Sequence, residues 1–128
     1  MKVVFALLVA LGAALYFPSS RAVLLDTLAP VLNPMLGWAT RGEMRAMARD
    51  LEQRVNTGRP IPGNRQEFET WLENNYQAGD SRTDSWGNLY ALERWTDSFA
   101  VVSPGPDGEV GTEDDIRVIQ LIERDRFP

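Results

Sequence analysis

The hydrophobic pattern of this chain changes its period once, and that change limits the folds it can adopt. Between Thr40 and Tyr76, apolar residues recur every three or four positions, which is typical of helices. From Leu89 onward, the pattern changes to the shorter period of strands. Helices followed by strands predict an α+β fold, in which a long helix packs on a small antiparallel sheet of about three or four strands.

Two helices are expected in the first of these regions. Thr40 and Glu43 have the spacing of a capping box, so we expect the first helix to begin there. It should end near Asn56, because Pro60 and Pro62 follow closely. Its predicted inner face consists of apolar residues at helical spacing: Met44, Met47, Ala48, Leu51 and Val55.

The second predicted helix is shorter and begins at Asn64. Asn64 is a favourable cap, and Glu67 follows at the capping-box spacing. The predicted inner face of this helix is apolar and aromatic, and consists of Phe68, Trp71, Leu72 and Tyr76. Residues 77–84 are polar and predict a loop.

Three strands are expected in the second region. Residues 89–95 and 98–102 flank Thr96 and Asp97, which form a plausible hairpin turn. Residues 116–122 predict the third strand. An acidic loop therefore separates the second strand from the third.

The N-terminal segment, residues 1–22, predicts an export signal or a signal-anchor helix. Lys2 precedes an uninterrupted apolar run that Pro18 ends. This run is shorter than the roughly twenty residues that comfortably span a bilayer. Cleavage after Ala22 and retention as an anchor are both open, and we favour the anchor.

Residues 23–39 are also apolar, and Asp26 is their only charged residue. Because Pro30 and Pro34 interrupt this stretch, we expect a linker or a membrane-proximal segment. Lys2 is the only charge near the inner end, so a domain comprising residues 40–128 should face the periplasm from the inner membrane. Cleavage would instead give a periplasmic or secreted protein.

Composition excludes several classes of function. The chain contains no cysteine or histidine, and Lys2 is its only lysine, so thiolate, imidazole and phosphate-loop chemistry are absent. Carboxylates remain as catalytic groups, so a carboxylate-based hydrolase is the one enzymatic function that stays open. We expect no enzyme and no small-molecule substrate. The formal charge of −5 argues against nucleic acid, which needs a basic surface.

The segment Ser103-Pro-Gly-Pro-Asp-Gly-Glu-Val-Gly-Thr-Glu-Asp-Asp-Ile116 combines carboxylates and a threonine hydroxyl with three glycines. Oxygen ligands on a flexible backbone suit a hard cation, Ca²⁺ before Mg²⁺. A solvated acidic turn is the alternative, because Asp and Gly also dominate turns that bind no metal. We favour the metal loop, since the acidic groups and glycines occur together between two apolar strands.

Three segments in this order resemble type II secretion system protein G, the major pseudopilin. They are Leu51 to Pro62, which ends in Asn-Thr-Gly-Arg-Pro-Ile-Pro; Asp84-Ser-Trp-Gly-Asn-Leu-Tyr90; and the acidic loop. The likeness covers about residues 42–122. That family's leader and its Gly-Phe-Thr-Leu-Ile-Glu segment have no counterpart here, so we expect a non-pilin N-terminus.

The resemblance implies a structural calcium site in the acidic loop. It implies side-chain ligation by Asp107 and by one or both of Asp114 and Asp115. It also implies a backbone ligand at Pro104 and a further carbonyl near Val110 or Thr112. Three further residues, Trp86, Gly87 and Asn88, are implied to be structural.

The resemblance also implies a role. The chain would be a non-enzymatic envelope protein with a structural or interaction role in a secretion or pilus-type assembly, with other envelope or secretion-system proteins as partners. A free-standing periplasmic or secreted binding module of the same fold is the alternative.

Overall fold

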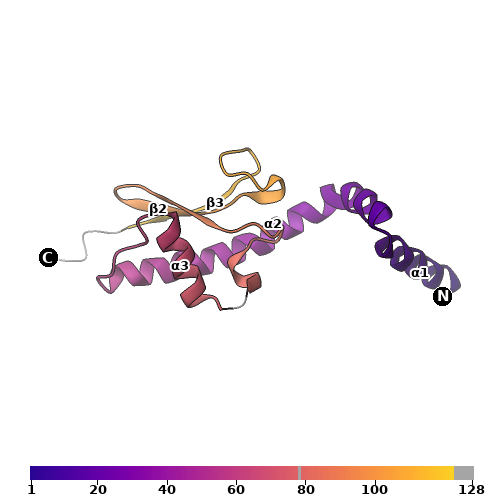
Figure 1. Ribbon diagram of the computed structural model, residues 1–128, viewed down its shortest axis with the longest axis horizontal. Coiled ribbons are helices and arrows are strands. Elements are labelled where there is room, and N and C mark those ends of the chain that lie inside the picture. The colour runs from indigo at the N-terminus through magenta and orange to yellow at the C-terminus, as the bar shows by residue number, and fades with distance from the viewer. Residues whose placement is uncertain (78, 123–128) are drawn as a thin grey trace. The chain divides into compact units, whose positions relative to one another are not determined.

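The computed structural model describes residues 1–77 and 79–122, and it has an α+β architecture, as the sequence predicts (Figure 1). In chain order its helices and strands are α1 (Lys2–Tyr16), α2 (Pro18–Asn56), α3 (Arg65–Asn75), β1 (Ala91–Arg94), β2 (Ser98–Ser103) and β3 (Ile116–Leu121). Two short 3-10 helices add to these: η1 (Gly79–Arg82) and η2 (Gly105–Asp107). The chain divides into two compact units, Met1–Met35 and Leu36–Pro128.

The first unit is apolar and has no buried residue. Helix α1 ends at Phe17, whose backbone is extended, and α2 begins at Pro18. By length and composition, one described helix, α2, could cross a membrane, and none of its apolar 18-residue stretch is buried. A membrane anchor and a signal sequence both have this character.

Helix α2 begins earlier than the sequence predicts. It runs from Pro18 through Pro30 and Pro34 to Asn56, so the expected start at Thr40 is wrong. Each internal proline removes only one hydrogen bond, and here the helix continues past both of them. The capping-box residues have other roles: Thr40 is fully buried and bonds to Ser85, while the carboxylate of Glu43 accepts from the Tyr90 hydroxyl.

Helix α3 begins as predicted, at the cap residue Asn64. The Glu67 N–H donates to Asn64 Oδ1 (2.9 Å), and the Glu67 carboxylate accepts from the Gly63 N–H. The first bond satisfies a donor that the first helical turn leaves open, and the second ties the residue before the cap to the helix. The inner face is also confirmed, because Phe68, Trp71 and Leu72 are buried.

The sheet is antiparallel with strand order β1-β2-β3. All six residues of β2 are buried, and Val101 pairs with Leu92 on one side and Val118 on the other. Strand β1 begins at Ala91, two positions later than predicted. Leu89 instead forms an isolated bridge with Thr83, which takes it out of the sheet.

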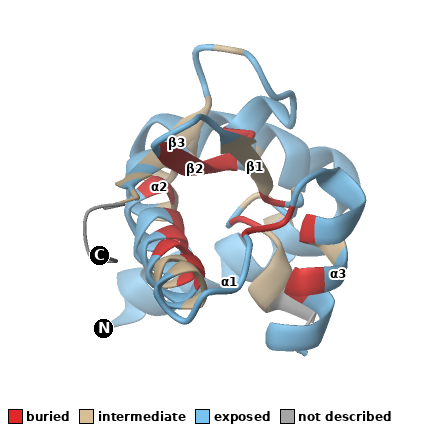
Figure 2. Ribbon diagram, turned by 90° about the vertical axis from the view of Figure 1, so that its left-hand side faces the viewer, coloured by how far each residue is buried: buried red, intermediate tan, exposed pale blue. Residues whose placement is uncertain are grey.

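The core of the second unit fills the space between the sheet and the two helices. Figure 2 shows the buried residues of α2, α3 and β2 facing this space. The large buried apolar side chains of this core come from all three elements: Met44, Met47, Leu51, Phe68, Leu72, Phe99 and Val101. This core fixes the end of β2, where the acidic loop begins.

Candidate metal loop

The loop between β2 and β3 closes on Gly105. The backbone of Gly105 has φ +73°, which strains any residue with a side chain. A Cβ at this position would also lie 2.2 Å from the carbonyl oxygen of Asp114. Both ends of the loop therefore meet at a point where only glycine fits.

A buried carboxylate ties this loop to the segment before β1. Asp84 is 5% exposed, and its Oδ1 accepts from the N–H groups of Trp86 (3.0 Å) and Asn88 (2.9 Å). Its Oδ2 accepts from the Ser103 hydroxyl (2.6 Å), and Ser103 Oγ in turn accepts from the Gly105 N–H (3.1 Å). Asp84 thus fixes the start of the loop from inside the fold.

The Trp-Gly-Asn segment supports the same region. Gly87 adopts φ +84°, and its N–H donates to the Asp84 carbonyl. The side chain of Asn88 donates to the carbonyl of Gly105 (3.0 Å). The ring of Trp86 lies 3.8 Å from the point where a Cβ of Gly37 would be. These contacts join the tryptophan turn to both the loop and α2.

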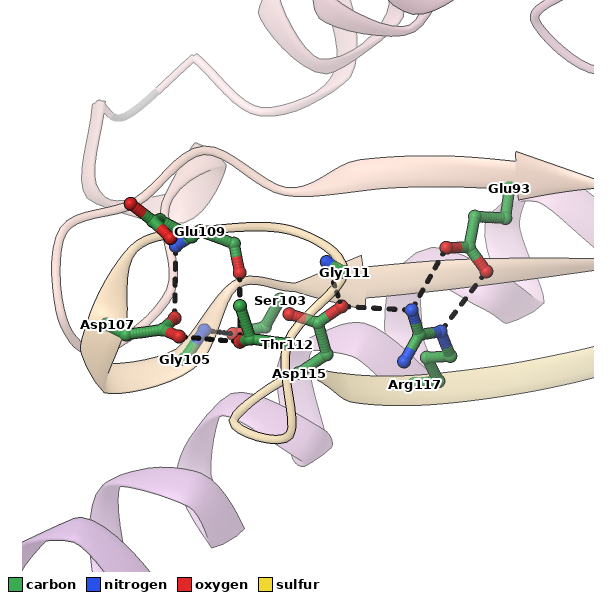
Figure 3. Close-up of polar contacts among 9 residues, drawn as sticks. All are labelled: Glu93, Ser103, Gly105, Asp107, Glu109, Gly111, Thr112, Asp115 and Arg117. Carbon is green, nitrogen blue, oxygen red and sulfur yellow. Dashed lines mark hydrogen bonds and ion pairs between the residues drawn. The ribbon is translucent and has the colours of Figure 1, made fainter.

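Among the predicted ligands, the structure brings Asp107 and Thr112 together. Asp107 Oδ2 accepts from the Thr112 hydroxyl (2.5 Å), and its Oδ1 accepts from the Glu109 N–H (3.0 Å), as Figure 3 shows. These bonds hold the pKa of Asp107 below its ordinary value of 3.8, and the bond from Thr112 has the larger effect. The Asp107 carboxylate is at the surface, where water can also reach it.

Asp115 occupies a different environment. Its side chain is fully buried, and its Oδ2 accepts from the Gly111 N–H (2.7 Å) and from Arg117 (2.9 Å). Arg117 also pairs with Glu93 of β1 at 3.2 Å. Within the described part of the chain, Oδ1 of Asp115 has no hydrogen-bond partner, and it carries no dashed line in Figure 3.

For two other predicted ligands, Pro104 and Asp114, the structure shows a role of the backbone in the loop. Pro104 precedes η2 as its cap residue, and Asp114 is exposed while its carbonyl oxygen contacts Gly105. Over residues 1–77 and 79–122, no three acidic side chains gather into a group that could hold a metal ion. A cation here would therefore need hydroxyl or backbone oxygens as well, which calcium accepts. The unpartnered Asp115 oxygen fits such an ion.

Sequence reasoning gave no role to four residues of this site: Asp84, Ser103, Arg117 and Glu93. Ser103 ends β2, while Arg117 and Glu93 form an ion pair across the sheet. In the ladder, Glu93 lies opposite Ala100 and Arg117 opposite Val102, so both side chains lie on the same outer face. Opposite charges at outward positions of the two strands that flank β2 were the signal available for this pair.

Comparisons with models of known protein families, with curated proteins and with solved structures give no match for this chain.

Proposed function

We propose that this chain is a non-enzymatic envelope protein whose C-terminal domain is a calcium-stabilised structural or interaction module of the type II secretion protein G kind. An N-terminal anchor would hold it at the inner membrane with the domain in the periplasm. Its role would be that of a part in a secretion or pilus-type assembly, with other envelope proteins as partners.

The observation that carries the calcium part is the buried, unpartnered oxygen of Asp115. A buried polar atom without a partner costs roughly 1–3 kcal/mol, and more when the group is charged. A cation bound there would remove this penalty. Asp107, Thr112 and the loop carbonyls are the remaining oxygen donors that would hold it, and calcium tolerates such a mixed, irregular set.

Calcium binding would add stability because the loop exists only in the folded state. At a concentration about 100-fold above the Kd, the gain is about 2.7 kcal/mol. For a domain of this size, this corresponds to a rise in Tm of about 10 °C or more. The test is thermal unfolding of the full chain in detergent, in calcium and in EDTA.

Variants locate the effect. Asp115→Ala and Asp107→Ala should each abolish the calcium-dependent rise in Tm. Glu113→Ala should keep it, because Glu113 is an exposed acid of the same loop whose side chain makes no hydrogen bond or ion pair with the described residues. If wild-type samples melt alike in calcium and in EDTA, the loop is an ordinary hydrogen-bonded acidic turn.

The second candidate function is a free periplasmic or secreted binding module. It is favoured by the apolar stretch near the N-terminus, because a signal sequence has the same character. Cell fractionation with mass spectrometry of the intact protein separates the two proposals. Full-length protein in the membrane fraction supports the anchored protein, and a chain beginning at Val23 in the soluble fraction supports the free module.

A further inference from the structure

Strand β1 forms a free edge of the sheet. In the strand order β1-β2-β3, it has a strand neighbour on one side only among residues 1–77 and 79–122. The Trp95 N–H donates to the Ser98 carbonyl (2.9 Å), so these two residues form a hydrogen-bonded pair. Because such pairs alternate along an antiparallel ladder, Leu92 and Arg94 direct their backbone N–H and C=O groups toward the open side. These groups can accept an added strand.

A groove of about 660 Å³ runs beside this edge, between β1 and the start of α3. Figure 2 shows β1 as the strand on the α3 side of the sheet. Two apolar side chains that line the groove, Leu89 and Val110, are 46% and 52% exposed. The groove therefore combines an open strand edge with apolar surface that a bound segment would cover.

The charge of the groove is positive in an otherwise acidic protein. The two charged residues that line it are Arg65 and Arg94, while the whole chain carries a formal charge of −5. Arg65 pairs with Glu69 at 2.8 Å, but Arg94 has no ion pair with any other described residue. Glu67 Oε2 and Arg94 Nη1 lie 3.1 and 3.3 Å from the point where a Cβ of Gly63 would be, but they form no ion pair. Arg94 can therefore still pair with an incoming carboxylate.

The geometry points to this groove as a docking site for an extended, acidic peptide segment of a partner protein. The segment adds to β1 as a further strand, bonded to the outward groups of Leu92 and Arg94. Its apolar side chains cover Leu89 and Val110, and an Asp or Glu pairs with Arg94. A second copy of this chain fits less well through its other sheet edge, because β3 carries Arg117 and has no acidic residue.

The first experiment selects peptides from a random dodecapeptide phage library on the full chain in detergent. Selected peptides should place Asp or Glu beside β-branched residues. Arg94→Glu should weaken their binding about tenfold or more, as expected when a charge-assisted hydrogen bond is lost and a like charge replaces it. Arg49→Glu is the matched control, because Arg49 is exposed on α2 outside the groove, and it should bind like the wild type. Circular dichroism checks that both variants fold.

The second experiment measures amide hydrogen exchange with and without a selected peptide. The N–H groups of Leu92 and Arg94 should become protected, while that of Glu93, already in the ladder, should not change. The inference is overturned if the selected peptides bind both charge variants equally, or if protection appears only away from β1. It is also overturned if Arg94 proves to mediate a dimer of this chain, which sedimentation would show.

Discussion

The buried carboxylate of Asp84 gives the sharpest test of how the loop is held. Replacing it with alanine leaves three donors without their acceptor: the N–H groups of Trp86 and Asn88 and the hydroxyl of Ser103. Hydrogen bonds to a charged group contribute about 1.5–3 kcal/mol each, and bonds that share one acceptor group are not additive. We therefore expect Asp84→Ala to destabilise the domain by roughly 3–5 kcal/mol.

Asp84→Asn should cost less, about 1–2 kcal/mol. The amide oxygen can still accept from Trp86 and Asn88, but the amide NH₂ would face the Ser103 hydroxyl, which then loses its acceptor. The predicted order of stability is wild type, then Asn, then Ala.

The assay is thermal unfolding of the full chain in detergent, followed by near-ultraviolet circular dichroism. At about 4 °C or more per kcal/mol for a domain of this size, Asp84→Ala should lower Tm by roughly 12 °C or more. Glu113→Ala, which removes an exposed carboxylate, should leave Tm within about 2 °C. If Asp84→Ala melts as close to the wild type as this control does, the hydrogen-bond network does not hold the loop.

Two further predictions concern backbone fit and pH. Gly105→Ala should destabilise the domain by at least about 1–2 kcal/mol through left-handed backbone strain alone, and more through the clash with the Asp114 carbonyl, measured as a lower Tm; an unchanged Tm would contradict the fit described above. Burial, followed by the hydrogen bond to Glu43, raises the pKa of Tyr90 above its ordinary value of 10.0, so the unfolded state ionises first. The contribution of Tyr90 to the free energy of unfolding is therefore complete below about pH 10 and declines as the pH rises further. Above about pH 10, the Tm of Tyr90→Phe should fall less with pH than the Tm of the wild type. Parallel curves of Tm against pH would refute the assignment.

The parts of the fold predicted from the sequence are those whose signals are local. The start of α3 rests on Asn64 and Glu67, which are three positions apart and bond to each other. The hairpin rests on two turn residues between two apolar runs. Cap and turn residues act on neighbours in the chain, so their effect is visible in the sequence.

The predicted start of α2 was wrong because the capping-box pattern has two physical meanings. A threonine followed by a glutamate can cap a helix, but the same side chains can bond across the fold. Here Thr40 bonds to Ser85 and Glu43 to Tyr90, more than forty residues away. No local pattern distinguishes these outcomes. For the same reason, the ion pair of Arg117 with Glu93 depends on strand register and escaped prediction.

The contacts around Asp84 also connect the loop to the helix that supports the sheet. Ser85 donates to the Leu36 carbonyl and bonds to Thr40 of α2, and the adjacent Asp84 reaches Gly105 through Ser103. Anything that binds the loop only in its folded form stabilises this whole chain of contacts, because it shifts the same folding equilibrium. Linkage is reciprocal. If the folded loop binds a ligand better than the loosened loop does, a substitution at Thr40 that loosens α2 must also weaken binding of that ligand at the loop. We therefore expect the loop to unfold together with α2 and the tryptophan turn, and hydrogen exchange of the three segments would test this.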